Sequence, residues 1–137
     1  MGTMAEYDRA AAAAREGLSG HPVLQDCIRF ATLAPSGHNT QPWRFRVAAG
    51  RIEILPDFAR RTPVVDPDDH HLFVGLGCAA ENLALAAGAQ RCPGTLSFNP
   101  ADNGSVVFAS GDGPGAVPAL FAAIPGSRSA RTEYDGR

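Results

Sequence analysis

Hydrophobic positions along the chain repeat at two spacings, one typical of helices and one typical of strands. Apolar residues at positions 23–34 recur every three or four residues, which predicts a helix that ends at Pro35. A second helical stripe covers positions 68–88, and small residues within it permit close packing. We expect this stripe to be the central buried helix. Its expected start is Asp66-Pro67, because aspartate caps helices and proline suits the first turn.

Strand-like alternation occurs in two further regions. Trp43, Phe45 and Val47 alternate with arginines, and a second alternation at positions 52–54 follows, so this region predicts a hairpin with one face in the core. Short strands are expected around the turn at residues 99–104. We also expect an N-terminal helix within residues 1–20, a short helix at 117–124 and a polar C-terminal tail at 126–137. Helices mixed with hairpins favour an α+β fold class over a doubly wound parallel sheet.

Composition limits the classes of protein to consider. The chain has 137 residues and a mass of 14.3 kDa, which suits a single domain over residues 1–137. Its net charge is -2 and its arginines are scattered, so we expect no nucleic-acid partner. We find no window with about 20 uninterrupted apolar residues, and therefore expect no membrane association and a cytoplasmic location. Three widely spaced cysteines favour neither a disulfide framework nor a zinc site.

The most informative stretch is the polar loop between the expected helix and the first expected strand. It contains a hydroxyl, a glycine, an imidazole and two carboxamides, contributed by Ser36, Gly37, His38, Asn39 and Gln41. These groups, beside the flat apolar surface of Trp43, suit a polar aromatic ligand. The alternative is an ordinary connection in which Ser36 and Asn39 only satisfy backbone groups of the turn.

This loop also resembles the flavin-binding loop of the nitroreductase family. The shared pattern Pro-Ser-x-x-Asn-x-Gln-Pro-Trp is matched at Pro35, Ser36, Asn39, Gln41, Pro42 and Trp43. Residues 38–43, 63–67 and 76–83 are similar more narrowly to the Acg-like actinobacterial branch of that family. The resemblance covers residues 23–83 best. It implies a partial nitroreductase-like fold, in which this chain corresponds to the N-terminal part only.

The resemblance further implies FMN as the cofactor and a set of residues that bind it. In the loop these are Pro35, Ser36, Gly37, His38, Asn39 and Gln41, with Ser36 and Asn39 as the hydrogen-bonding side chains. The family also uses an Arg-x-Ser/Thr-x-Arg segment for the flavin phosphate and ribityl oxygens. The nearest candidates here are Arg128, Ser129 and Arg131, although Ser127 stands where the first arginine belongs. A charged tail without a ligand is the alternative for that segment.

The activity implied by the resemblance is transfer of hydride from NAD(P)H to FMN, and then to a small nitroaromatic or quinone-like acceptor. The cofactor supplies this chemistry, so no catalytic acid, base or nucleophile is required in the sequence. Family members build the site where two subunits or two fused halves meet, so we expect a homodimer or association with a second half. The alternatives are a non-catalytic flavin-sequestering or regulatory protein, and an incomplete domain that holds no cofactor.

Other polar motifs favour structural interpretations. Arg60-Arg61 could contact a phosphate or a dinucleotide, but paired arginines in a polar loop are usually solvated. His70-His71 do not predict a metal site, because adjacent helical residues point about 100° apart and no third ligand has suitable spacing. Glu81-Asn82 are polar within an apolar stripe and are expected either to find buried partners or to face solvent. No spacing indicates a hydrolase triad, a P-loop or a Rossmann fingerprint.

Overall fold

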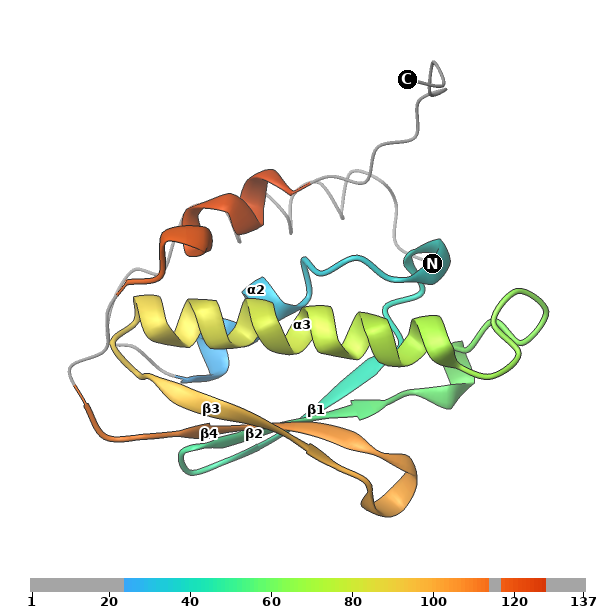
Figure 1. The fold of residues 1–137 in the computed structure, drawn as a ribbon, viewed down its shortest axis with the longest axis horizontal. Helices are drawn as coiled ribbons and strands as arrows, with labels where there is room; N and C mark the ends of the chain where they lie inside the picture. The colour runs from blue at the N-terminus through green and yellow to red at the C-terminus, as the bar shows by residue number, and fades with distance from the viewer. Residues whose placement is uncertain (1–23, 114–116, 128–137) are drawn as a thin grey trace.

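The computed structural model describes residues 24–113 and 117–127, and within them helices pack on one face of an antiparallel sheet (Figure 1). The regular elements are α2 (Ile28–Ala31), β1 (Trp43–Ala48), β2 (Arg51–Pro56), α3 (His70–Ala89), β3 (Gly94–Asn99) and β4 (Ser105–Ser110). Short 3₁₀ helices cover Leu24–Cys27, Gly37–Asn39, Phe58–Arg60, Ala101–Asn103 and Ala119–Gly126. The helix expected within residues 1–20 lies outside the described residues. The arrangement is α+β and is compatible with a partial nitroreductase-like fold.

The four strands are ordered β1-β2-β4-β3, and every neighbouring pair is antiparallel. Both hairpins predicted from the alternation are confirmed. Ile52 on β2 lies opposite Phe108 on β4, which in turn lies opposite Leu96 on β3. These residues therefore share the face of the sheet that meets the helices, since residues directly opposite on paired strands share a face.

The core forms where α3 crosses this face. The apolar stripe of α3 is buried as predicted, at Leu72, Leu76, Ala79, Ala80, Leu83, Ala86 and Ala87. Asn82 on the same helix donates from Nδ2 to the carbonyl oxygen of Phe30 at 3.2 Å, so it links α3 to α2. Its neighbour Glu81 is exposed. Asn82 thus has a hydrogen-bond partner inside the fold, whereas Glu81 faces solvent, so each of the two interpretations holds for one of the residues.

The helix predicted over residues 23–34 is present in part, because the 3₁₀ helix at Leu24–Cys27 continues directly into α2, which is a single α-helical turn and ends at Ala31. After Thr32 the backbone bonds change to 3₁₀ type, since Leu33 and Ala34 donate to carbonyls three residues earlier. The Thr32 hydroxyl also donates to the Arg29 carbonyl at 2.8 Å, a local bond that competes with helix continuation. The predicted helix at 117–124 is likewise a 3₁₀ helix, and it contains Pro125.

Helix α3 is apolar along most of its length, although it has no long uninterrupted apolar run. It has 20 residues with a mean hydropathy of 1.5, so by length and composition alone it could cross a membrane. Half of that window is buried inside the fold, and the core helix of a globular domain passes the same test. The packing against the sheet therefore accounts for its apolar character.

The opposite face of the sheet holds a buried carboxylate. Glu53 on β2 is only 8% exposed, although it lies on the face away from α3. Ser105 Oγ donates to its Oε1 at 2.7 Å, and Arg46 Nη1 donates to its Oε2 at 2.9 Å. The Ser105 hydrogen bond and the charge of Arg46 lower the pKa of Glu53, against the effect of burial. This cluster ties β1, β2 and β4 together.

The three cysteines are unpaired, and they differ in surroundings. Cys27 is buried beneath α3, and burial raises the pKa of its thiol to about 12. Cys78 and Cys92 are partly exposed. Among the described residues, no group of three histidine, cysteine or acidic side chains is placed to hold a metal ion.

Candidate functional site

The loop between α2 and β1 has an unusual backbone. His38, Asn39 and Gln41 have φ angles of 50°, 54° and 49°, in the left-handed region that non-glycine residues seldom enter. The bend is closed by backbone bonds from Asn39 to Ser36 at 2.9 Å and from Thr40 to Gly37 at 3.1 Å. Three such residues within four positions are costly, and strain of this kind clusters at functional sites.

The side chains of the loop divide into an inner and an outer set. Pro35, Gly37, His38 and Asn39 are exposed, whereas Ser36 and Gln41 are half-buried. Ser36 Oγ accepts a hydrogen bond from the backbone N–H of Gln41 at 3.0 Å. Ser36 therefore satisfies a turn group, as the alternative interpretation expected, but its hydroxyl proton remains available to a ligand. Asn39 shows no side-chain hydrogen bond among the described residues.

The loop is held against α3 from behind. Trp43 is buried in the core, where it anchors the start of the hairpin. Gly75 on α3 faces the loop, and a methyl group in place of its hydrogen would lie 3.6 Å from the Pro35 carbonyl oxygen. By contrast, a methyl group at Gly37 would meet nothing within 4 Å. The backbone at Gly37 is thus open to an approaching molecule.

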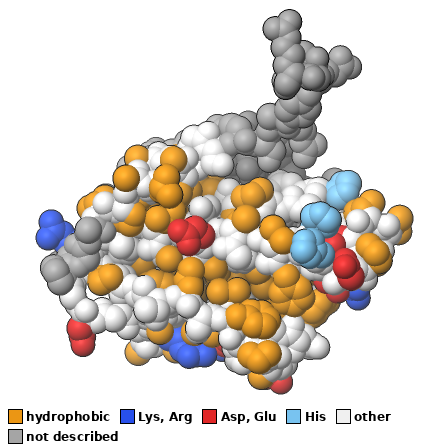
Figure 2. All heavy atoms as spheres, viewed as in Figure 1, with side chains coloured by type: hydrophobic (Ala, Val, Ile, Leu, Met, Phe, Trp, Pro, Cys, Tyr) orange, Lys and Arg blue, Asp and Glu red, His pale blue; other side chains and the backbone are white. Residues whose placement is uncertain are grey.

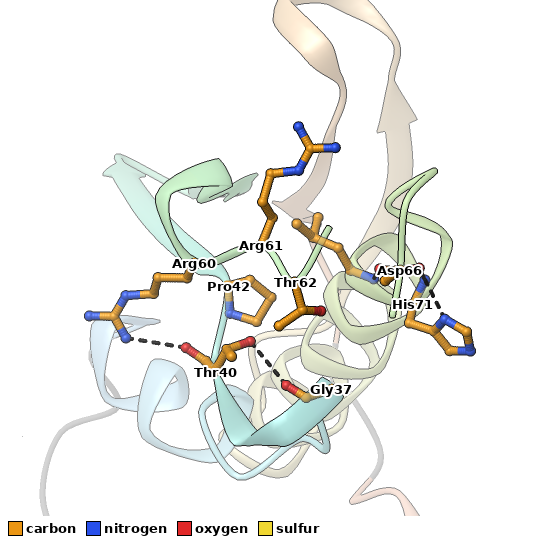
Figure 3. A pocket seen from close by; sticks show the side chains of 9 residues that line it. Gly37, Thr40, Pro42, Arg60, Arg61, Thr62, Asp66 and His71 are labelled. Carbon is orange, nitrogen blue, oxygen red and sulfur yellow. Dashed lines mark hydrogen bonds and ion pairs between the residues drawn. The ribbon is translucent and has the colours of Figure 1, made fainter. Parts of the chain in front are cut away.

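A second segment, residues 57–71, forms the other wall of a shallow pocket beside this loop (Figure 3). The pocket is lined by Gly37, Thr40, Pro42, Arg60, Arg61, Thr62, Asp66, His71 and Leu72. Its enclosed space is about 10 Å³, roughly the room for one water molecule. A flavin ring is far larger, so the described residues offer a surface for part of a ligand rather than an enclosing cavity.

The two arginines of this wall are exposed at the surface, and both have acidic partners. Arg60 Nε lies 3.6 Å from Asp57 Oδ2, and its Nη1 donates to the Thr40 carbonyl at 3.3 Å. Arg61 Nη2 lies 2.9 Å from Asp69 Oδ2. Since each guanidinium already has a carboxylate, the pair does not present two uncompensated positive charges. The arrangement favours the structural interpretation of Arg60-Arg61 over a phosphate site.

The start of α3 completes the wall. The helix begins at His70, with Asp69 at its N-cap position in a left-handed conformation (φ 58°), so the predicted start at Asp66-Pro67 is wrong. The carboxylate of Asp66 nevertheless caps the first turn of α3. Its Oδ1 accepts from the backbone N–H of His71 and its Oδ2 from that of Leu72, both at 3.0 Å. Asp69 makes no cap bond, and its Oδ1 is buried without a partner among the described residues.

Asp66 also contacts the imidazole of His71, with 3.0 Å between Oδ1 and Nδ1. Burial acts to raise the pKa of Asp66, but the hydrogen bonds from His71 and Leu72 outweigh it and lower that pKa. Asp66 is therefore ionised at neutral pH. The Asp66-Pro67 pair indicates a helix cap at Asp66, whereas the pairing with His71 depends on how the loop folds back onto the helix.

Of the six loop candidates, Gly37 lines this pocket, next to residues that the sequence did not single out for binding, whereas the other five are not among the lining residues. Thr40, Thr62 and His71 belong to the same pocket, and only the tertiary fold reveals them. The candidates Arg128, Ser129 and Arg131 lie outside the described residues, so their assignment stays a prediction.

Comparisons with known proteins agree with the resemblance seen in the loop. No family model matches the chain. Over 118 residues, 81% of the chain, it is 31% identical to a protein named "Putative NAD(P)H nitroreductase" in two strains of Mycobacterium tuberculosis. It is also 25% identical over 85 residues, 59% of the chain, to an uncharacterized protein of the same two strains. The matches cover 34% of the first relative and 25% of the second, so the chain spans about a third or less of the curated relatives it matches.

Proposed function

We propose that this chain belongs to a nitroreductase-type oxidoreductase, in which the loop at residues 35–41 binds FMN. The similarity to proteins named as NAD(P)H nitroreductases supports the oxidoreductase class. The observation that carries the proposal is the shape of the loop. Its strained backbone holds His38 and Asn39 outward and leaves Gly37 open, while Trp43 and Gly75 fix it from behind.

The groups present in the loop fit the polar part of a flavin. Ser36 can donate its hydroxyl proton, and Asn39 can both donate and accept at the polar edge of the ring. Pro35 and Gly37 allow a close approach of backbone to the cofactor, and His38 and Gln41 border it. Arg128, Ser129 and Arg131 are proposed to contact the ribityl and phosphate oxygens, which guanidinium groups bind well.

In the proposed reaction, hydride passes from NAD(P)H through FMN to a nitroaromatic or quinone-like small molecule. The bound flavin supplies the redox chemistry. The residues of this chain orient the ring, supply hydrogen bonds to it and keep water from its inner side.

The proposed site is completed by a second subunit or a second half. The pocket of the described residues is too small for a flavin, and an apolar surface lies over α3 and β3 (Figure 2). That surface includes Val74, 51% exposed, and Phe98, 61% exposed, with the rings of Phe73 and Phe98 6.5 Å apart. Exposed apolar patches of this kind often mark protein interfaces. We propose no nucleic-acid partner, no membrane association and a cytoplasmic location.

Two measurements test the function. Protein purified with FMN should show a flavin absorption band that remains after gel filtration, and NADPH should bleach that band. Oxidation of NADPH should then continue when a nitroaromatic compound is added. A retained flavin that NADPH fails to reduce would reject the enzyme in favour of flavin sequestration. A protein that retains no flavin would reject both.

A further inference from the structure

The pairing of Asp66 with His71 goes beyond what a helix cap requires. Two backbone N–H groups are enough for a cap, and Asp66 receives these from His71 and Leu72. The additional contact joins Asp66 Oδ1 to Nδ1 of the imidazole at 3.0 Å. Asp66 is 5% exposed, so its carboxylate is a fixed and buried partner.

This contact determines which ring nitrogen of His71 is available. An ionised carboxylate can only accept hydrogen bonds, so Nδ1 carries a proton and donates it to Asp66. Nε2 is then the nitrogen left for other molecules, on a side chain that is 70% exposed. A carboxylate behind an imidazole fixes the orientation and the tautomer of the ring. The pair therefore has the arrangement of an oriented proton carrier.

The location of His71 links it to the proposed flavin loop. Its side chain belongs to the same pocket as Gly37 and Thr40, on the side opposite Arg60 (Figure 3). Within the described part of the chain, Arg60 and Arg61 also line this pocket, each paired with an aspartate, and the ring of His70 lies 5.4 Å from that of His71. The loop wall contributes only uncharged residues to the pocket.

We propose that His71 is the proton donor to the oxygen of the electron acceptor, with Asp66 as its positioning residue. This inference rests on the proposed function. Reduction of a quinone to a hydroquinone adds one hydride and one proton. The hydride, with both electrons, comes from NAD(P)H through the bound flavin. The proton moves from Nε2 of the imidazolium to the carbonyl oxygen, and the neutral imidazole then recovers a proton from water.

The variant His71→Asn separates this role from the cap. An asparagine amide can keep the bond at the position of Nδ1, but it has no group at the position of Nε2. His70→Asn is the matched control, because His70 is an exposed neighbour outside the pocket lining. Melting temperatures of the two variants should match that of the unmodified chain to within a few degrees.

The first test compares two acceptors with FMN-loaded protein and NADPH. Duroquinone requires a proton when it is reduced, whereas ferricyanide takes electrons only. In His71→Asn the rate with duroquinone should fall at least about tenfold, at the low end of what a general acid contributes. The rate with ferricyanide should not change, and His70→Asn should leave both rates unchanged. Equal losses with both acceptors, or no loss with duroquinone, would overturn the role of His71.

A second readout requires no turnover. Duroquinone added to oxidised protein without NADPH should shift the imidazole NMR signals of His71, and it should leave those of His70 in place. Unshifted His71 signals would overturn the contact with the acceptor. If the unmodified chain reduces neither acceptor with NADPH, the proposed function itself fails, and the proton-donor role fails with it. If the unmodified chain reduces both acceptors but His71→Asn does not show the predicted loss with duroquinone, the proton-donor role is overturned and the proposed function stands.

Discussion

Gly75 and Pro35 face each other across the contact between α3 and the loop, where any side chain at Gly75 would point at the Pro35 carbonyl oxygen. A methyl group at Gly75 would lie 3.6 Å from that oxygen, 3.8 Å from the Trp43 ring and 3.9 Å from Ser36 Cβ. These are ordinary contact distances, and they leave no room for a larger group. The helix therefore sets how far the loop projects from the core.

The first prediction concerns this contact. Gly75→Ala should be tolerated, and it should raise the free energy of unfolding by up to about 1 kcal/mol, because alanine favours helix over glycine. Gly75→Leu should push the loop outward and weaken FMN binding by about tenfold or more, which is about 1.4 kcal/mol. Urea unfolding and a fluorescence titration with FMN measure the two effects. Equal FMN affinity in both variants would show that α3 does not set the loop.

The second prediction concerns Asn39. Its replacement by alanine should weaken FMN binding by about 1–3 kcal/mol, if its amide pairs with the cofactor. Asn103→Ala is the matched control, because Asn103 is also an exposed asparagine with positive φ, at 73°, but in the turn between β3 and β4. Alanine at a position with positive φ should lower the folding stability of both variants by a similar amount. If the two variants bind FMN equally well, Asn39 is not part of the site.

The third prediction concerns strain in the loop. Replacing His38 or Gln41 by glycine should stabilise the fold by about 0.5–1 kcal/mol, because glycine adopts a left-handed backbone without the cost that other residues incur. Thr40→Gly, at a position with a φ of -71°, should instead lose stability, because glycine gains nothing there and has more conformational freedom to lose on folding. Thermal unfolding of the three variants checks the ranking. A loss of stability in His38→Gly would mean that the side chain makes a stabilising contact.

The fourth prediction concerns Glu53 and acid. The Ser105 hydrogen bond and Arg46 lower the pKa of Glu53 in the folded state, so its contribution to stability is present above the unfolded pKa, about 4.3. That contribution is lost as pH falls through the folded pKa. Glu53→Gln should therefore be less stable than the unmodified chain at pH 7, and the difference should shrink below about pH 4.

Urea unfolding between pH 3 and pH 7 measures this difference. Ser105→Ala removes the hydrogen bond that contributes most to the lowered pKa of Glu53. When Glu53→Gln is compared with Glu53 in chains that carry Ser105→Ala, the stability difference should therefore vary less with pH. The carboxylate of Asp66 titrates in the same direction, but it is common to all variants and cancels in the comparison. If the difference in free energy of unfolding between Glu53→Gln and the unmodified chain stays constant with pH, the pKa of Glu53 is not lowered in the folded state.

The parts of the fold that the sequence predicts well are those in which hydrophobic spacing decides the outcome. The stripe of α3 and both hairpins follow from periodicity, because one face of each must be buried. The helix at residues 23–34 was overestimated, because apolar spacing does not show that Thr32 bonds to Arg29 and that the backbone tightens before Pro35. Local hydrogen bonds, rather than burial, end that helix.

The site shows the same division between local pattern and tertiary contact. The loop at residues 35–43 could be found from its sequence, because its residues are contiguous. The wall formed by Thr62, Asp66 and His71 could not, since those residues meet the loop only after the segment at residues 57–69 folds back. The left-handed φ at Gln41 could not be predicted either, because glutamine is not among the residue types enriched in that region.

Whether the loop at residues 35–41 binds FMN can be measured by a titration of this chain with FMN. Flavin fluorescence and the melting temperature should be followed across protein concentrations that favour self-association. If the loop binds FMN, the flavin fluorescence should change until the site is saturated, and the melting temperature should rise with FMN concentration, as expected for a ligand of the folded state. The Asn39→Ala variant should require more FMN for the same rise. If saturating FMN changes neither quantity at any protein concentration, the loop is not a flavin site.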